Sequence, residues 1–450
     1  MSGDLLNQPV SAHQPHASLR PSACPGLLRI VQAKDGGICR IKLAGGALTA
    51  DQADTVATAA ERFAAGEIEA TNRGNLQIRG IGSEQAGLIE LLLAAGLGPR
   101  DAAGDDVRNL MLSPVAGIDP RMLFDTRPLA AQLLQALETT PRFHQLSAKF
   151  AVQLDGGEAL AMLEHPHDLW LSGLQLDDAL WLAFGLAGCP AQDSPLGAVP
   201  LAQGHELVLA VLHRFLDLAR PEQARMRQLL VEHSPDDFVA GLGLSIRRDP
   251  AVLQWRRTAM AGNGYLGIYP QRQAELSAVG GAAPLGRLNP SMLRGAAQLA
   301  REWGDGSLRM TPWQSLLLPN IPHRQVDAVR TGLAQLGLLC SADEKLVRLV
   351  ACTGSTGCAK AQAETKGDAR VLATLLTSGA PASVHLSGCP RSCAMAHVAA
   401  ATLLAQSPGH YDLYLRDAAQ PGFGNLRARN LTLKEAGALL DACSRSTLDD

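Results

Sequence analysis

The hydrophobic and polar positions of the chain repeat at an interval of 240 residues, which is the spacing of Leu48 from Leu288 and of Thr71 from Thr311. In each copy a helical pattern leads through a glycine-containing turn into an alternating strand pattern, and a second apolar run and another helical stretch follow. These helical and strand patterns lie at 49–65, 68–71, 289–303 and 308–311. Each copy therefore predicts a β-α-β-β-α unit, with chance similarity of two helix–strand segments as the alternative.

Two further segments alternate with the repeat. Residues 99–240 hold strand-like runs such as 150–154 and helical runs such as 202–218, so we expect a separate α/β unit there. The segment after the second copy holds the clustered cysteines of the chain. We therefore predict a mixed α/β (α+β) fold with a pseudo-twofold repeat. The expected units are a disordered tail at 1–25, half-domains at 26–98 and 241–342, an α/β domain without a cluster at 99–240 and a cluster-binding α/β domain at 343–445.

Composition narrows the possible partners. A hydrophobic fraction of 46% and a charged fraction of 18% are typical of a soluble globular protein. Aromatic residues make up only 4% and the net charge is −3, which argues against a nucleic-acid partner and means that an anionic ligand needs a local group of Arg and Lys. No apolar stretch approaches the ~18 residues of a membrane span, and no secretion signal is recognisable, so we expect a cytoplasmic protein without a membrane partner.

Four of the nine cysteines, Cys352, Cys358, Cys389 and Cys393, form two closely spaced pairs. Four thiolates suit either a zinc ion or an iron–sulfur cluster. Five residues rich in Gly, Ser and Thr separate the first pair, and this wide spacing favours a [4Fe-4S] cluster, with four buried thiols in an ordinary core as the alternative. Pro390 predicts a first helical turn after Cys389. The other cysteines are isolated and are expected to be buried: Cys24, Cys39, Cys189, Cys340 and Cys443.

The pattern Cys-x5-Cys followed by Gly-Cys-Pro-x-x-Cys resembles the cluster motif of the sulfite and nitrite reductases, and the resemblance covers residues 25–445. It implies a pseudo-twofold pair of ferredoxin-like half-domains and reductase-like α/β domains. In that family the last cysteine bridges the cluster to a sirohaem, which implies that Cys393 faces a tetrapyrrole site.

Basic residues that resemble those gripping the tetrapyrrole carboxylates in this family occur in several segments. Thr71 to Arg79 is similar to the Thr-x-Arg-x-x-x-Gln stretch of the family, and Val107-Arg108-Asn109 to its Arg-Asn segment. Arg side chains can bind carboxylates through two parallel hydrogen bonds. A solvated charge at a strand end is the alternative for any one of them. The resulting candidates for tetrapyrrole binding are Arg73, Arg79, Arg108, Lys149, Arg309 and Gln314.

The chain also departs from the reductases. Where they carry a Lys-x-Lys pair, it has Lys149 and Ala151, which makes reduction of an oxyanion less plausible because each step needs a proton source. The stretches at 267–271 and 309–314 resemble precorrin-3B synthases, a shorter branch of the family. That resemblance implies precorrin-3A and O2 as substrates. The reaction hydroxylates the meso carbon between rings A and D and closes a γ-lactone, in aerobic cobalamin biosynthesis, and no sirohaem is expected.

Further cofactors and donors follow from the same resemblance. It implies a mononuclear non-haem iron, for which His165, His167 and Asp168 offer a facial triad, with an ordinary polar loop as the alternative. His385 and His397 are expected to support the cluster through hydrogen bonds. No nicotinamide domain is recognisable, so the electrons should come from an external donor, NADH-derived or a reductase protein. The alternative functions are a sirohaem-dependent sulfite or nitrite reductase and a non-catalytic tetrapyrrole-binding or electron-transfer iron–sulfur protein.

Overall fold

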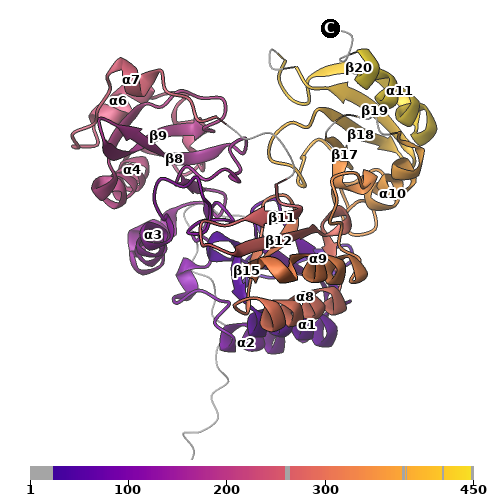
Figure 1. The fold of residues 1–450 in the computed structure, drawn as a ribbon. Coiled ribbons are helices and arrows are strands. Elements are labelled where there is room, and N and C mark those ends of the chain that lie inside the picture. The colour runs from indigo at the N-terminus through magenta and orange to yellow at the C-terminus, as the bar shows by residue number, and fades with distance from the viewer. Residues whose placement is uncertain (1–23, 259–263, 378–380, 382, 418–419, 447–450) are drawn as a thin grey trace, which may run out of the picture.

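The structure is a computed structural model that describes residues 24–258, 264–377, 381, 383–417 and 420–446, with side chains up to residue 442. Nearly all of the tail expected at 1–25, and the side chain of Cys443, lie outside the described residues. Figure 1 shows a central lobe built from both repeat copies and two α/β lobes above it. We call residues 103–253 lobe 1 and residues 343–446 lobe 2. Among the described residues, no helix combines the length and the apolarity needed to cross a membrane.

The central lobe contains two five-stranded sheets that exchange an edge strand. The first sheet has the order β1(Val31–Ala33), β2(Gly36–Ile41), β5(Leu76–Ile81), β4(Glu67–Ala70) and β13(Arg287–Leu288). The second has the order β11(Gly267–Pro270), β12(Leu276–Ala282), β15(Ser315–Pro322), β14(Ser307–Met310) and β3(Ala47–Thr49). Leu288 of the second copy pairs with Ile68 of the first, and Leu48 of the first pairs with Leu308 of the second. The two copies are therefore interlocked.

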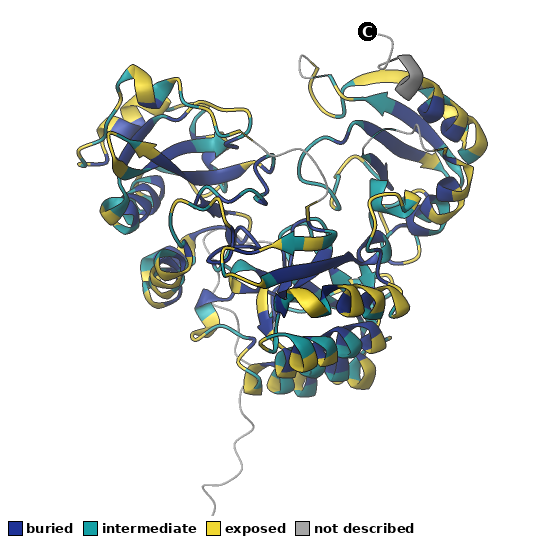
Figure 2. Cartoon of the chain, viewed as in Figure 1, coloured by how far each residue is buried: buried dark blue, intermediate teal, exposed yellow. Residues whose placement is uncertain are grey.

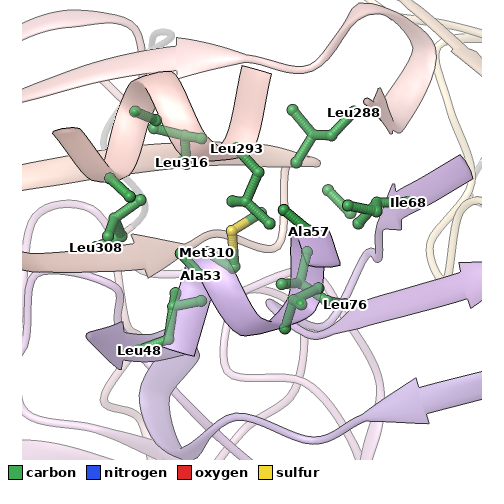
Figure 3. Packing of buried hydrophobic residues seen from close by; sticks show 14 of the residues in the cluster. Leu48, Ala53, Ala57, Ile68, Leu76, Leu288, Leu293, Leu308, Met310 and Leu316 are labelled. Atoms are coloured by element: carbon green, nitrogen blue, oxygen red, sulfur yellow. The ribbon is translucent and has the colours of Figure 1, made fainter. Parts of the chain in front are cut away.

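The helices of the central lobe begin at equivalent positions in the two copies. They are α1(Ala50–Phe63), α2(Gln85–Ala94), α8(Pro290–Trp303) and α9(Val326–Gln335). Thr49 caps α1 by accepting a hydrogen bond from the Gln52 backbone, and Asn289 caps α8 in the same way with Met292. The apolar faces of these helices and the sheets enclose one core, in which Leu48, Ile68, Leu288 and Leu308 meet (Figure 3). The side chains that the sequence repeat aligns therefore lie in a single shared core.

Lobes 1 and 2 have the same sheet topology. Lobe 1 contains β6(Leu110–Leu112), β7(Val152–Asp155), β8(His167–Leu176), β9(Ala179–Gly188) and β10(Gly197–Pro200), with α3(Arg127–Thr139), α4(Gly204–Leu218), α5(Met226–Leu229), α6(Pro235–Ala240) and α7(Pro250–Leu253). Lobe 2 contains β16(Leu349–Ala351), β17(Val384–Ser387), β18(Ala401–Ser407), β19(His410–Leu415) and β20(Asn425–Thr432), with α10(Thr365–Leu375) and α11(Leu433–Ser446). In both, the first three strands are parallel and the last two antiparallel. The strands are largely buried and the helices expose their outer faces (Figure 2).

The predicted fold class is confirmed, and the predicted helices and strands of the repeat lie within about two residues of the observed ones. The sequence pattern did not predict β1 and β2 of the first copy or β12 of the second, whereas β11 overlaps the strand-like run that the sequence shows at 265–269. β1 is an edge strand of three residues without a fully buried position, and so short a strand leaves little signal in the sequence. The strand exchange was also not predicted, because strand pairing depends on tertiary structure.

Candidate functional site

The two cysteine pairs lie at the ends of adjacent parallel strands. Cys352 follows β16 directly, and Cys389 lies two residues after β17, which pairs in parallel with β16. Because parallel strands end at the same edge of a sheet, the two loops meet. Cys393 is the exposed member of the set, and the partial burial of its thiol, together with the thiols of the other three cysteines, raises its pKa. The structure therefore brings the four thiols together.

Backbone and hydroxyl groups lie against the sulfur of Cys352. The Gly388 N–H donates to Cys352 Sγ at 3.2 Å, and the Thr365 hydroxyl oxygen lies 3.4 Å from the same sulfur. A Cβ atom at position 388 would lie only 2.6 Å from Ala361 Cβ, so glycine is required there. The helical turn predicted at Pro390 is not formed, because Ser392 adopts a left-handed conformation with φ of 51°.

The donor set suits an iron–sulfur cluster. Thiolates are the ligands of such clusters, and N–H groups directed at sulfur stabilise them. Within the described part of the chain, no three His, Cys, Asp or Glu side chains converge closely enough to hold a single metal ion. A zinc ion would hold its sulfur ligands about 4 Å apart, whereas a four-iron cluster spreads its thiolates around a larger body.

Lobe 1 holds hydrogen bonds at the place where lobe 2 holds cysteines. Ser113 follows β6 directly, as Cys352 follows β16, and Asp119 lies six residues further on, as Cys358 does. The Ser113 hydroxyl donates to the Leu160 carbonyl at 2.7 Å, and the Asp119 carboxylate accepts from the Ala159 N–H at 2.8 Å. In lobe 1 these bonds join the loops after β6 and β7.

Arg79 fastens the first cysteine loop to the central lobe. Its guanidinium donates twice to Asp35, at 2.9 Å each, and once to the Gly357 carbonyl at 3.3 Å. Its side chain is 6% exposed. The prediction that Arg79 binds tetrapyrrole carboxylates therefore needs correction, because its hydrogen-bonding groups face the protein's own Asp35 and cysteine loop.

Glu69 is the centre of a second contact with the same loop, and the sequence did not reveal it. Its carboxylate lies 3.6 Å from Arg287, 3.7 Å from Lys366 and 3.8 Å from Arg79. The Thr353 hydroxyl, next to Cys352, also donates to it at 3.3 Å. Burial acts to raise the pKa of Glu69, but the surrounding cations hold it below its usual value. Residues of both repeat copies and lobe 2 therefore meet at this carboxylate.

Arg73 differs from Arg79 because its guanidinium has no ion pair or hydrogen bond with the described residues. It lies in the turn between β4 and β5, in a depression lined also by Gly46 and Pro312. Burial, together with the nearby charges of Arg225 and Arg40, lowers the pKa of Arg73 to about 10. A partly buried cation with like charges beside it is a favourable place for an anionic ligand.

Arg40 and Arg225 are the charged neighbours of Arg73, and we call these three residues the arginine row. Arg40 lies on β2, where Gln77 can accept from its Nε and Nη2 at 3.2 and 2.9 Å, and the Cys393 thiol is one of its electrostatic neighbours. Arg225 donates to Asp168 at 2.9 Å. The row thus extends from Cys393 to lobe 1. The sequence did not predict it, because Arg40 and Arg225 come from distant segments and match no motif that we recognised.

The proposed iron triad is not assembled. The Asp168 carboxylate accepts from Arg225 and from the backbone N–H groups of Ala151 and Met226, at 2.9 and 2.8 Å. His167 Nδ1 lies 2.8 Å from the His165 carbonyl oxygen, and burial lowers the pKa of His167 to about 3. The His165 ring instead faces His397 of lobe 2, with 5.0 Å between ring centroids. The sequence grouped these residues because they are adjacent, but their side chains face different partners.

The other residues predicted to bind the tetrapyrrole lie in different surroundings: two contact the protein, one is exposed and one lines a cavity. Arg108 is nearly buried and lies 3.4 Å from Glu138, and Arg309 donates to the Pro114 and Ala116 carbonyls at 3.0 and 2.8 Å. Both predictions need correction, since these guanidinium groups are directed at the protein. Lys149 is exposed. Gln314 lines a cavity next to lobe 2.

Comparisons with known protein families match three of the four units. The model described as the nitrite/sulfite reductase ferredoxin-like half domain matches residues 30–95 and 269–336, which are the two repeat copies. The model described as the nitrite and sulphite reductase 4Fe-4S domain matches residues 103–247. That segment is lobe 1, which contains Cys189 as its single cysteine. The clustered cysteines lie in lobe 2, which repeats the same sheet topology.

Individual relatives agree with these matches. The chain is 32% identical to the chloroplastic ferredoxin–nitrite reductase of Zea mays, over 80% of this chain and 68% of that protein. It is 26% identical to a precorrin-3B synthase from a Sinorhizobium species, over 95% of this chain and 92% of that one, which supports the resemblance noted from the sequence. The solved structure of the Mycobacterium tuberculosis NirA protein has the same fold, with a TM-score of 0.73 and 23% identity over 91% of this chain and 80% of that chain. The chain belongs to the nitrite and sulfite reductase family.

Proposed function

We propose that this chain is an oxygen-dependent monooxygenase that converts precorrin-3A to precorrin-3B in the cytoplasm, with one [4Fe-4S] cluster held by Cys352, Cys358, Cys389 and Cys393. The observation that carries the proposal is the arginine row, in which Arg40 has Cys393 as an electrostatic neighbour and Arg73 has no partner for its guanidinium among the described residues. The nearly full-length similarity to a precorrin-3B synthase supports the choice of substrate.

The arginine row suits a ring that carries many carboxylates. Each charge-assisted hydrogen bond to a carboxylate contributes about 1.5–3 kcal/mol when it is shielded from water. Arg73 can supply such bonds without breaking a contact within the described part of the protein. Arg225 is held in place by its Nε hydrogen bond to Asp168 and is an electrostatic neighbour of Arg73. Exposed Lys149 adds a further cation on lobe 1.

The overall reaction balances with an external donor. One atom of O2 enters the macrocycle at the meso carbon between rings A and D, and the other leaves as water after uptake of two electrons and two protons. The bound cluster would pass on these electrons singly, and the arginine row would hold the ring carboxylates and so fix the meso carbon relative to Cys393. His165, His167 and Asp168 do not form a ligand set for a second iron, so we assign no step of the reaction to them.

The second candidate is a sirohaem-dependent nitrite or sulfite reductase, which the 32% identity to a nitrite reductase favours. Position 151 argues against it. Reductases of the family carry a lysine there, whereas Ala151 is 3% exposed and offers no proton. Its N–H donates to Asp168, which in turn binds Arg225. A guanidinium stays protonated at neutral pH, so Arg225 can bind a carboxylate but is a poor proton donor.

The deciding experiment combines a spectrum with an isotope measurement. Anaerobically purified protein should contain about four irons and show cluster absorbance without sirohaem bands. Incubation with precorrin-3A, a reductant and labelled O2 should then give a product with one labelled oxygen atom, detected by mass spectrometry. Cys389→Ser protein serves as the control without a cluster. Sirohaem bands together with turnover of nitrite or sulfite would refute the proposal in favour of a reductase. Binding of precorrin-3A without turnover would refute it in favour of a non-catalytic carrier.

A further inference from the structure

Two histidines from different lobes face one another at the wall of a polar cavity. The rings of His165, from lobe 1, and His397, from lobe 2, have centroids 5.0 Å apart and planes inclined by 41°. Both line a cavity of about 190 Å³ that is open to solvent and lies between the central lobe and the two other lobes. Pro312 lines this cavity and also the depression at Arg73, so the two spaces adjoin.

Both imidazole rings carry a nitrogen without a partner. His165 is 2% exposed, and its Nδ1 is buried without a hydrogen-bond partner among the described residues. The Nδ1 of His397 is buried without a partner in the same way. Burial, together with neighbouring His397, keeps the pKa of His165 well below its usual value, so this imidazole is neutral near pH 7 and keeps a lone pair. A buried polar atom without a partner is costly and calls for a ligand or another explanation.

The separation of the two rings suits a shared metal ion. A metal–nitrogen bond is about 2.0–2.1 Å long, so two imidazoles in neighbouring positions on one ion have ring centres roughly 4.5–5.5 Å apart. The observed separation lies in that range. Imidazole nitrogens are good ligands for divalent iron, cobalt, nickel and zinc. The alternative is an ordinary contact between two rings.

The protein supplies two ligands at this place. Within the described part of the chain, no third His, Cys, Asp or Glu side chain converges with two others on one ion. The carboxylate of Glu164 is paired with His397 and with Arg416, each at 3.5 Å. An ion held by the two imidazoles therefore has further positions open toward the cavity.

We propose that His165 and His397 bind a divalent transition-metal ion at the wall of this cavity, and that ligands from outside the protein fill its remaining positions. Ala394 and Met395, the two residues after Cys393, form part of the same wall, so the ion lies next to a cysteine loop. The metal site rests on the side chains alone. Its assignment to the mononuclear iron that the family resemblance implies rests on the proposed function.

Cobalt(II) is the probe, because it takes imidazole ligands and can be measured separately from the iron of the cluster. Two protein ligands hold an ion less firmly than three or four, so cobalt is added to the anaerobic holoenzyme and followed by equilibrium dialysis with metal analysis. His165→Gln and His397→Gln should each raise the Kd for cobalt at least tenfold, with unchanged cluster absorbance. His410→Gln, at a partly buried histidine of lobe 2, is the matched control and should keep the wild-type Kd.

Crystals of the holoenzyme soaked in cobalt should show an anomalous scattering peak between the two rings. A Kd for cobalt that is the same in His397→Gln as in the wild type would overturn the inference and leave an ordinary ring contact. Since His397 is the less buried of the two, this variant carries the test if His165→Gln does not fold.

The metal site and the proposed function can fail separately. If cobalt binds between the rings, yet no labelled oxygen enters precorrin-3A, the proposed function fails while the metal site stands. If His397→Gln has lost the cobalt site but incorporates labelled oxygen at the wild-type rate, the assignment to the iron of the reaction is overturned and the proposed function stands.

Discussion

Replacement of Arg73 by methionine should weaken ligand binding and at the same time stabilise the ligand-free protein. Methionine keeps much of the length of the side chain but removes its charge. The two effects have opposite signs because Arg73 lacks a partner among the described residues and stands beside Arg225 and Arg40. If Arg73 mainly stabilised the fold, its replacement would lower both the affinity for the ligand and the free energy of unfolding of the ligand-free protein.

The magnitude follows from the proton affinity of the guanidinium. The surroundings lower the pKa of Arg73 from 12.5 to about 10. Each tenfold change in proton affinity corresponds to about 1.4 kcal/mol, which sets an upper limit of about 3 kcal/mol on the cost of the charge. The side chain retains some contact with solvent, so screening reduces this gain to about 1–2 kcal/mol. Binding should lose about 1.5–3 kcal/mol, which is a 10- to 100-fold increase in Kd.

The assay uses a stable tetrapyrrole with many carboxylates, such as sirohydrochlorin, titrated into anaerobic protein and followed by absorbance. Urea unfolding of the ligand-free protein gives the stability. Arg324→Met, at an exposed arginine of the 3-10 helix His323–Gln325, should change neither quantity. The reasoning would be refuted by an unchanged Kd for Arg73→Met, or by a loss of more than 1 kcal/mol in the ligand-free free energy of unfolding.

Three further predictions concern the cluster and its surroundings. Cys389→Ser should lose the cluster absorbance and most of the bound iron, whereas Cys340→Ser should keep both; full iron and sulfide in Cys389→Ser would exclude it as a ligand. Glu69→Gln should cost about 3 kcal/mol near neutral pH by leaving Lys366 unpaired. Because the pKa of Glu69 is lowered on folding, its contribution is complete above about pH 4.5 and is lost on acidification, so urea midpoints of wild type and variant should converge at low pH. Asp168→Asn should keep its iron content but unfold at lower urea, and a loss of one iron per chain would restore it as a ligand.

The sequence predicted most of the fold because the repeat is encoded in core positions. Leu48 and Leu288 align at the 240-residue interval and then lie in one core, each in a strand added to the sheet of the other copy. The exchange of those strands was not predictable, because a three-residue apolar strand carries no information about its partner. The convergence of the four clustered cysteines was predictable because they come in two short, chemically distinctive segments.

The basic residues were harder to assign because the sequence does not show what each guanidinium meets. Arg79 and Arg73 lie in the same short stretch, yet Arg79 pairs with Asp35, which is 44 residues away in the chain. Arg309 meets carbonyl oxygens of a loop 195 residues away. Of these three, Arg73 is the one whose guanidinium has no partner among the described residues, and only that absence distinguishes it.

The divergence of the two copies gives a physical reason to expect that lobe 2, and not lobe 1, depends on a metal cluster. Position 69 of the first copy corresponds to position 309 of the second. Arg309 satisfies two carbonyls of the loop after β6, and Ser113 and Asp119 tie that loop to the next one. In lobe 2 the equivalent loop is held from outside by Glu69 and Arg79, while thiols stand where lobe 1 has its hydrogen bonds. Because thiols are weak hydrogen-bonding groups, a shared cluster is what can join these loops firmly, so the order of the cysteine loops should depend on metal loading.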